Sequence, residues 1–422
     1  MNLSNTSIKL YLSILFFGLL LPLLAFYASQ PGDFKVWLEA ATLLKRHQQL
    51  YNIWLGGRLY FYSPLFALIL IPFTYVPQYI PNFLFLCADI YFLFKIWKFF
   101  TVRIDFGQLN RKEKIIFSFA VALLTLRFLL YNFDYIQMTI FLLWALLESW
   151  SLFEKNKNLS GAFLLALAIN IKLMPVIFVP YLIYRGKIIP AVLTAVFFII
   201  FLYLPACFIG IDYNNALLSG WWSAINPANT AHLIETGPQS QSLTSFIPTL
   251  LMPTSGQLPF KRNIANLNVK TVILILNLCR AFFILLTLYF TGFTIFKNAK
   301  TKIYEYWEIG YIVMIVPLIF PHQQKYDFFL IVPAVMYSVY FLIYQWKEHF
   351  VNFSKTKWIV VMSLLILSFM LNTLTSDLFI GMYRSIVTQH YRAITYGTIL
   401  LIFVLALCHP KYLKPGKSGM PL

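Results

Sequence analysis

The chain has 422 residues, of which 60% are hydrophobic and only 11% are charged. Apolar runs long enough to cross about 30 Å of hydrocarbon recur from end to end, so this composition excludes a soluble globular protein. The formal charge of +18 comes from basic residues in short loops between the apolar runs, which indicates a positive-inside bias rather than a nucleic-acid surface. We expect an all-α integral membrane protein, a polytopic bundle forming one domain over residues 1–422.

Thirteen apolar segments are candidate membrane spans. They cover residues 8–28, 64–77, 82–100, 114–131, 135–152, 159–172, 173–184, 187–206, 269–296, 306–320, 326–345, 357–374 and 391–408. The segment 64–77 has proline at both ends and in its middle, and we expect it not to cross. The prediction is about twelve crossings of the cytoplasmic (inner) membrane.

More than half of the basic residues fall in loops that the positive-inside rule places in the cytoplasm, together with both termini and the tail 409–422. The opposite, outer face then receives the loop 29–63, the large loop 207–268 and the turn 321–326. Elaborate loops on one face indicate that this face carries the function.

The stretch "DFKVWLEAATLLKR" follows the first apolar segment and has apolar residues at three- and four-residue steps. These are Phe34, Trp37, Leu38, Ala41 and Leu44, with Lys35, Glu39, Thr42 and Arg46 on the opposite side. The pattern predicts an amphipathic helix lying on the membrane surface, apolar face down. Asp33 at its start is either a helix cap or a catalytic base held at headgroup depth.

"LYFYSPLFALILIPF" follows, with Tyr62 in an aromatic turn before the next apolar segment. Such aromatic residues form an interfacial belt or, together with Trp221 and Trp222 in the large loop, stack on sugar faces.

"LAINIKLMPVIFVPY" places Lys172 inside a long apolar stretch. A lysine at mid-membrane costs about 2.5 to 3.5 kcal/mol, which favours a use for it. Asn170 and Pro175 predict a helix break that lines a polar cavity. The functional interpretation is a cation for a lipid-linked phosphate; the structural one is a lysine that snorkels from a short helix.

Two more polar clusters lie at the same face. "LRFLLYNFDYIQMTIFLL" carries Arg127, Asn132, Asp134 and Gln137, and "FPHQQKYDFFLIVPA" carries His322, Gln323, Gln324, Lys325, Tyr326 and Asp327. Each alone is typical of helix capping, but their convergence with a buried lysine indicates a site. The sequence has no Asp-x-Asp pair and no His/Cys cluster, so we expect no bound metal and no cofactor.

Taken in order, these motifs resemble glycosyltransferase family 87, GT-C-type membrane mannosyltransferases that use a polyprenyl-phosphate-linked sugar. The resemblance covers about residues 30–340 and also includes "PQSQSLTSFI". The chain departs from the family at three places. The Tyr-x-Pro-Pro element reads Tyr62-Ser63-Pro64, the Gly-Gln-x-Asn element reads Ile136-Gln137-Met138-Thr139, and Tyr326 and Asp327 stand where histidines are usual.

The resemblance implies a GT-C bundle in which Asp33 is the general base of an inverting transfer, a role worth about 10²–10⁴-fold in rate. It implies a donor-phosphate site made of Lys172, Lys325, His322 and Tyr326. It further implies substrate contacts from Tyr62, Asp134, Gln137, Asn170, Gln241, Ser242 and Asp327.

The expected reaction moves a hexose, with mannose as first choice, from a polyprenyl-phosphate donor to a glycan or glycolipid acceptor at the outer face. Membrane lipids are the other expected partners, and nucleic acid is not one. Two alternatives stay open. A lipid-linked-oligosaccharide flippase or transporter needs charges on both sides of the midplane, and an O-antigen polymerase or ligase usually uses arginines within its large loop, where 207–268 has only Lys261 and Arg262 as cations.

Overall fold

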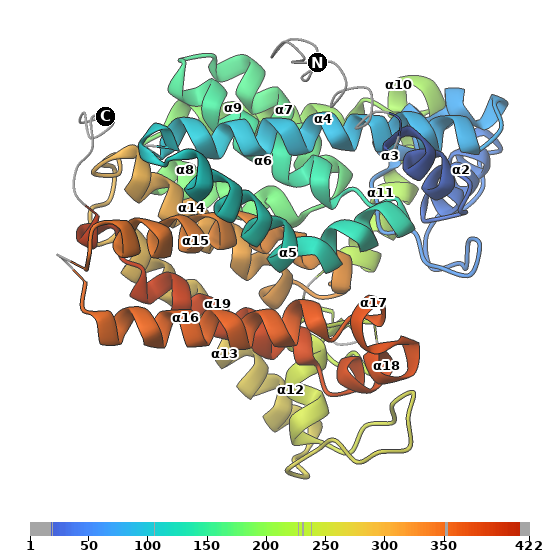
Figure 1. Ribbon diagram of the computed structural model, residues 1–422. Helices are drawn as coiled ribbons and strands as arrows, with labels where there is room; N and C mark the ends of the chain where they lie inside the picture. Colours follow the sequence, from blue (N-terminus) through green and yellow to red (C-terminus); the bar gives the residue numbers. More distant parts are fainter. Residues whose placement is uncertain are drawn as a thin grey trace, which may run out of the picture.

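A computed structural model describes residue 18 and residues 20–413, apart from 105, 227, 230, 231, 238, 351 and 352. Over these residues the chain is helical, without a β-strand, and has two isolated β-bridges. The helices pack into the bundle shown in Figure 1, which confirms the all-α prediction. Residues 20–28 are helical at the end of the first predicted span. The rest of that span and tail residues 414–422 lie outside the described residues.

The amino-terminal half forms short helices and long ones in alternation. They are α2 (Phe34–Lys45), α3 (Pro64–Leu70), η1 (Ile71–Tyr75), α4 (Tyr79–Arg103), η2 (Phe106–Gln108), α5 (Arg111–Tyr135), α6 (Thr139–Glu154), α7 (Asn158–Ile171), η3 (Met174–Ile177), α8 (Phe178–Tyr184) and α9 (Ile188–Tyr203).

The carboxy-terminal half continues the bundle. Its helices are α10 (Ala206–Ile209), α11 (Ile211–Ile225), α12 (Leu243–Leu251), α13 (Val269–Thr291), α14 (Lys302–Ile319), η5 (Lys325–Ile331), α15 (Val332–Lys347), α16 (Lys355–Phe369), η6 (Met370–Leu374), α17 (Asp377–Ile380), α18 (Met382–His390), α19 (Ala393–Leu407) and η7 (Pro410–Tyr412).

Five helical segments in the described part of the chain are long and apolar enough to cross a membrane. They are α5, α9 with α10, α13, η5 with α15, and α16 with η6. The pair α18 and α19, bent by 66°, makes a sixth if it counts as one span. The protein is thus a polytopic membrane protein, but the expected number of about twelve crossings is not confirmed. The predicted non-crossing segment 64–77 forms only α3 and η1, which pack against α2.

The helices α7 and α8 differ from the expectation of two crossings. They are short apolar helices that meet at an extended residue, Lys172 (φ −143°, ψ 129°). With 14 residues, α7 is about 21 Å long and cannot cross the hydrocarbon. Pro175 explains the break, because proline in a helix interior removes a hydrogen bond and clashes with the preceding turn.

The contacts of α7 and α8 show that the chain goes partway into the bundle and returns. The end of α8 lies beside the end of α13, where Phe296 N–H donates to Tyr184 O (2.8 Å) and Arg185 donates to Lys297 O (3.1 Å). The turn between the two helices contacts η5 inside the bundle, because the Lys172 amine pairs with Asp327. The pair is therefore a re-entrant hairpin with Lys172 at its tip.

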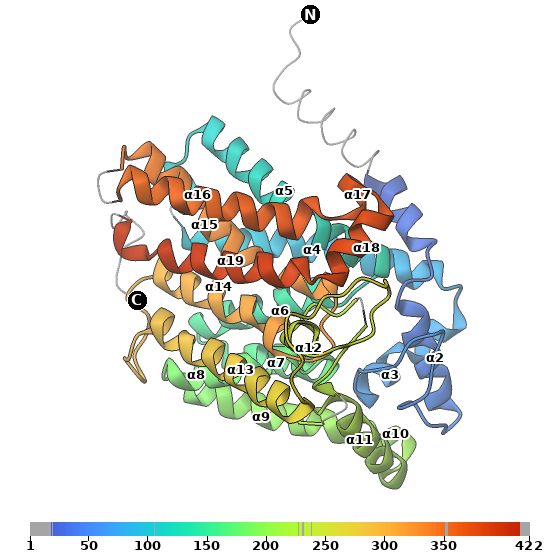
Figure 2. The same ribbon diagram turned by 90° about the horizontal axis from the view of Figure 1, so that it is seen from below.

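The two ends of the bundle have different characters. Figures 1 and 2 show α2, α3, α10, α11, α17 and α18 gathered at one end, which we call the site end. The opposite end, which we call the basic end, holds the end of α4 with Arg103, the start of α7 and residues 292–302. The helix α4 connects the ends, since Asn82 near its start donates to Ala28 O (2.9 Å).

The apolar face of α2 packs on protein rather than on lipid. Trp37 is fully buried, with its ring centroid 5.2 Å from Tyr62, 5.2 Å from Phe66 and 5.8 Å from Phe85. The predicted amphipathic helix is therefore confirmed, but the prediction that its apolar face lies on the membrane is wrong. The aromatic residues of α3 and α4 take the place of lipid and fix α2.

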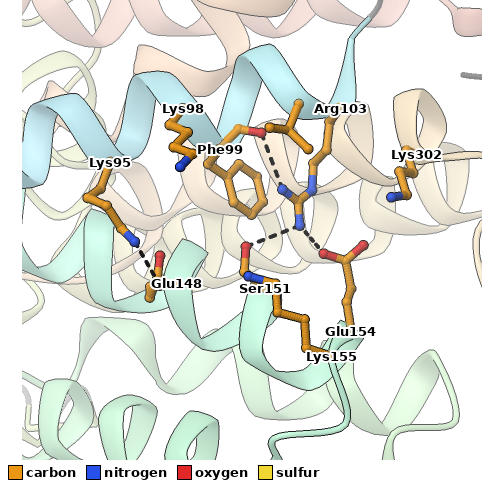
Figure 3. Close-up of a pocket in the computed structure, with 10 residues that line it drawn as sticks. Lys95, Lys98, Phe99, Arg103, Glu148, Ser151, Glu154, Lys155 and Lys302 are labelled. Atoms are coloured by element: carbon orange, nitrogen blue, oxygen red, sulfur yellow. Dashed lines mark hydrogen bonds and ion pairs between the residues drawn. The ribbon is translucent and has the colours of Figure 1, made fainter.

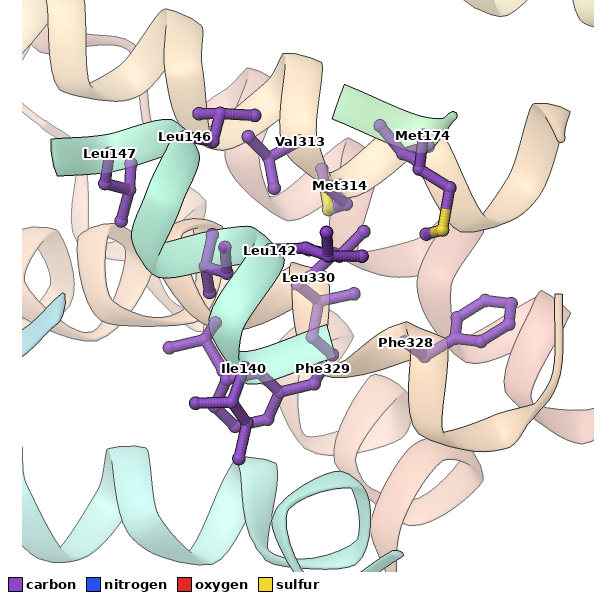
Figure 4. Close-up of a cluster of buried hydrophobic side chains, with 14 of the residues drawn as sticks. Ile140, Leu142, Leu146, Leu147, Met174, Val313, Met314, Phe328, Phe329 and Leu330 are labelled. Carbon is purple, nitrogen blue, oxygen red and sulfur yellow. The ribbon is translucent and has the colours of Figure 1, made fainter. Parts of the chain in front are cut away.

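Apolar packing also fixes the elements behind the site. A buried cluster joins α6, η3, α14 and η5, as Figure 4 shows. Its members include Ile140, Leu142, Leu146, Leu147, Met174, Val313, Met314, Phe328, Phe329 and Leu330. Burying one large apolar side chain contributes about 1.5–3 kcal/mol. Because these residues are chain neighbours of Thr139, Lys172 and Asp327, the packing holds those polar side chains in place.

Candidate active site

The Asp33 carboxylate faces polar side chains of other segments rather than the start of its own helix. Asp33 has helical backbone angles (φ −81°, ψ −12°), and its side chain makes no capping hydrogen bond. An N-cap side chain needs extended angles to reach the N–H groups of the first turn, so the predicted capping role is wrong. Instead Gln137 Nε2 donates to Oδ2, and Arg58 Nη1 forms an ion pair with Oδ1.

Local backbone geometry explains this orientation. Gly32 has φ +50°, and a Cβ there would lie 2.9 Å from the Tyr135 carbonyl oxygen, so only glycine fits. The close approach lets Asp33 N–H donate to the same carbonyl (2.8 Å). On the other side α5 ends with Ile136 in the left-handed region (φ 51°), which is a strained conformation for a β-branched residue. This turn carries Gln137 to Asp33.

A second ion pair lies inside the bundle. Lys172 Nζ is 2.7 Å from Asp327 Oδ1, and Asp327 is fully buried. Thr139 Oγ1 donates to the same oxygen (3.3 Å), while Gln324 N–H donates to Oδ2 (3.0 Å). The predicted helix break at Lys172 is confirmed, and its charge is balanced by a carboxylate. The Asp327 carboxylate is therefore both paired and hydrogen-bonded, which offsets the free-energy cost of burying its charge.

Tyr62 lies between the two ion pairs. Burial raises the pKa of its hydroxyl, Asp327 raises it further, and Arg58 lowers it, so both charges act on this one group. Asn170 joins the same region, because Ser63 Oγ donates to Asn170 Oδ1 (2.6 Å). The aromatic turn before α3 and the end of α7 are therefore held together beside Asp327.

Several buried polar atoms around these ion pairs have no hydrogen-bond partner among the described residues. They are Gln137 Oε1, Asn132 Oδ1, Asn170 Nδ2 and His322 Nε2. Unpaired buried polar atoms are rare in folded proteins because each costs about 1–3 kcal/mol. Donors and acceptors gathered at one place are what a polyhydroxylated ligand requires.

Lys325 adds positive charge at the end of α5, beside Tyr131 and Tyr135. Its amine lies 3.9 Å from the Tyr131 ring centroid and 5.4 Å from that of Tyr135. Arg58 lies 5.2 Å from the Tyr135 ring centroid, so two cations flank this tyrosine. Tyr326, one residue on, packs 6.0 Å from Tyr135 and 5.8 Å from the Lys172 amine. Asp134 is exposed at the last turn of α5.

His322 belongs to a network with the large loop. The ring atom Nδ1 lies 2.5 Å from Glu235 Oε1, and the backbone N–H of His322 donates to the same oxygen (2.8 Å). The His322 ring stacks on Phe61. Ser240 and Thr244 donate to the other oxygen of Glu235. Burial raises the pKa of Glu235, but the hydrogen bonds and charge of His322 outweigh burial and hold it below its usual value. Burial and His322 lower the pKa of His232.

Gln241 and Ser242 are both fully buried. Gln241 N–H donates to Gln323 O (3.0 Å) and its side chain donates to Gln389 O (3.2 Å). Ser242 shares a hydrogen bond with Thr244 (2.6 Å). These contacts attach the loop to the turn 321–326. Their predicted contact with substrate stays a prediction.

Of the two loop tryptophans, Trp221 is buried and donates to Phe61 O, whereas Trp222 is exposed.

Three residues of this region are absent from the sequence-based prediction. Arg58 follows two glycines in "GGRLYFY", and Glu235 is the only acidic residue in 213–268, so each had a local signal. Arg392 is far away in the sequence and had none. It is buried, and its guanidinium donates to the backbone oxygens of Gly237 (2.8 Å) and Ser240 (2.7 Å), which holds the loop.

Comparison with known protein families shows which family the chain belongs to. The family model described as glycosyltransferase family 87 matches residues 60–295, more than half of the chain. The chain belongs to glycosyltransferase family 87. Family 87 membership makes it a membrane glycosyltransferase, and the suspected resemblance is confirmed. The match contains Tyr62, Gln137, Asn170 and Lys172, whereas Asp33 and the turn 321–326 lie outside it. A search of curated proteins finds no match.

Proposed function

We propose that this protein transfers a hexose, with mannose as the first candidate, from a polyprenyl-phosphate donor to a sugar hydroxyl of a lipid-linked or cell-envelope glycan. The reaction takes place at the site end, on the outer face of the cytoplasmic membrane. The observation that carries the proposal is the Asp33 carboxylate, which meets a polar region with both oxygens instead of capping its helix.

The proposed reaction inverts the anomeric carbon. Asp33 accepts the proton of the acceptor hydroxyl while the oxygen of that hydroxyl forms a bond to the anomeric carbon. The bond from that carbon to the phosphate oxygen breaks at the same time, and polyprenyl phosphate leaves with the electron pair. The leaving phosphate is already a weak base, so it needs no proton from the protein.

The cations around the site stabilise the charge that develops on the phosphate. Lys172 forms an ion pair with Asp327. The two cations Lys325 and Arg58 flank Tyr135. His322 presents the atom Nε2, which has no partner among the described residues. Tyr326 supplies a neutral hydroxyl in the same region. The unpaired amide atoms of Gln137 and Asn170 contact hydroxyls of the two sugars.

The test is a transfer assay with purified protein in lipid nanodiscs. Radiolabelled mannose is offered on polyprenyl phosphate or on a nucleotide, with a total glycolipid extract as acceptor. The proposal predicts label in glycolipid from the polyprenyl donor only. Transfer from the nucleotide donor instead, or movement of intact lipid-linked sugar between leaflets without a new bond, would refute it.

A further inference from the structure

A polar cavity lies at the basic end, far from Asp33. It has a volume of about 280 Å³ and opens between α4, α6 and the start of α14 (Figure 3). The residues that line it are Lys95, Lys98, Phe99, Val102, Arg103, Glu148, Ser151, Glu154, Lys155 and Lys302. The helix α4 separates it from the site end, because Asn82 and Arg103 are about 30 Å apart along the helix. The cavity is therefore not part of the candidate active site.

The charges that line this cavity do not balance. Lys95 pairs with Glu148 (3.0 Å), and Arg103 pairs with Glu154. Both carboxylates are thereby used. Among the described residues, the remaining lining cations, which are Lys98, Lys155 and Lys302, have no ion pair. Figure 3 shows Lys98 reaching from α4 toward the space above α6. Three unbalanced ammonium groups around one cavity fit a dianionic or monoanionic ligand.

The cavity continues into a lipid-facing surface. Leu84, Tyr91, Lys95, Lys98 and Val102 follow one another along α4 at steps of seven, four, three and four residues, so they form one straight stripe. Leu84 and Tyr91 are each more than half exposed, as apolar side chains in contact with hydrocarbon would be. The stripe thus changes from apolar to basic as it enters the cavity.

The helix α6 forms the other wall. Trp144 lies one turn before Glu148 on the side of α6 that leads to Ser151 and Lys155. Its ring stacks on Phe92 with centroids 4.3 Å apart, and its Nε1–H is buried without a partner among the described residues. The Trp144 ring centroid also lies 6.4 Å from that of Tyr91, so Trp144 supports the apolar stripe where it approaches the basic cavity.

We propose that this cavity binds the phosphate headgroup of an anionic membrane phospholipid. Lys98, Lys155 and Lys302 hold the phosphate, and the acyl chains lie along Leu84 and Tyr91. Basic pockets between membrane helices bind anionic lipid headgroups in this way. This lipid-binding site is separate from the site of the proposed transfer reaction. The proposal therefore does not depend on the identity of the sugar donor.

The experiment is lipid binding to the full-length purified protein, counted by native mass spectrometry. The probes are phosphatidic acid, phosphatidylcholine with matched chains, and inorganic phosphate as competitor. The site variant is Lys98→Gln with Lys155→Gln. The control variant is Lys112→Gln with Lys355→Gln, which removes two exposed lysines at the starts of α5 and α16.

The proposal predicts one tight phosphatidic acid per wild-type or control protein, at least tenfold preferred over phosphatidylcholine. The site variant should lose about tenfold in affinity while its melting temperature without lipid stays that of the control, because the lysines removed are exposed. Equal losses in both variants would assign the binding to diffuse surface charge and overturn the proposal. Displacement by inorganic phosphate at equal concentration would also overturn it, since the site would then recognise a free anion.

Discussion

At the residue scale the site depends on charges that balance one another before any substrate arrives. Asp33 is paired with Arg58 and Asp327 with Lys172, so each carboxylate is held by one cation. The two pairs differ in exposure: the Arg58 side chain is 42% exposed, whereas Asp327 is fully buried. Mutation of the inner pair should therefore affect folding, whereas mutation of the outer pair should leave folding largely unchanged.

The inner pair gives a prediction that separates stability from donor binding. Lys172→Met leaves Asp327 buried without its cation, and breaking such a pair costs about 3–5 kcal/mol. Adding Asp327→Asn removes the stranded charge, so the double variant should recover most of the melting temperature. It should not recover donor affinity, because the cation is still missing. Donor titration and thermal melting of both variants decide this, and full recovery of donor binding in the double variant would limit Lys172 to a structural role.

Arg58 should act on binding with little effect on folding. Arg58→Gln removes a cation beside Tyr135 and releases Asp33, so we expect donor affinity to fall about tenfold or more while the melting temperature changes by little, as is usual for exposed positions. Arg58→Lys keeps the charge and should recover part of the affinity. Titration with polyprenyl phosphate alone measures this effect, and Lys45→Gln, an exposed change on α2, is the control. Unchanged affinity in Arg58→Gln would remove Arg58 from the site.

At the scale of elements, the large loop is ordered by polar contacts that depend on protonation. The pKa values of Glu235 and His232 both lie below their usual values, so the folded loop favours the charged carboxylate and the neutral imidazole. Their stabilising contributions are full above the unfolded pKa values of about 4.3 and 6.5. These contributions are lost as the pH falls through the pKa values of Glu235 and His232 in the folded protein, which lie below the unfolded ones.

The loop should therefore loosen in acid. Hydrogen exchange of peptides covering 232–245, corrected for intrinsic rate, should rise as the pH falls below about 6.5 and again below about 4.3. Glu235→Gln should remove the second step and raise exchange at neutral pH, because it weakens the hydrogen bonds that Glu235 accepts from His322, Ser240 and Thr244. A peptide from α14 is the reference. Protection that stays constant or grows in acid would contradict the assignment.

Most of the long helices could be predicted from the sequence, because uninterrupted apolar runs determine them without tertiary information. The segments 82–100, 114–131, 187–206 and 357–374 each became a helix with similar bounds. The hairpin of α7 and α8 was read as two crossings, since composition does not show the direction in which a short apolar helix runs. Arg392 shows the same limit at the site, because its contact with the loop joins residues about 150 positions apart.

At the scale of the whole molecule, the bundle has a site end and a basic end, with Lys172 between them at the tip of the hairpin. In a cysteine-free variant, single cysteines at exposed Gln257 and Lys112 should react with an impermeant thiol reagent from opposite sides. The positive-inside rule predicts that Gln257 reacts from outside. A cysteine at Leu173 should react slowly from either side. Fast labelling of 173 from outside would restore α7 as a full crossing.

Asp33→Asn tests the central claim most directly. Asparagine keeps the volume of Asp33 and can still hydrogen-bond with Gln137, but it cannot accept the proton of the acceptor hydroxyl. We predict that transfer of mannose from polyprenyl phosphate to glycolipid falls by at least 10²-fold, while donor binding and the melting temperature stay close to those of the wild type and of Asp212→Asn, an exposed control on α11. Transfer at a rate near that of the wild type in Asp33→Asn would contradict the assignment of Asp33 as the base.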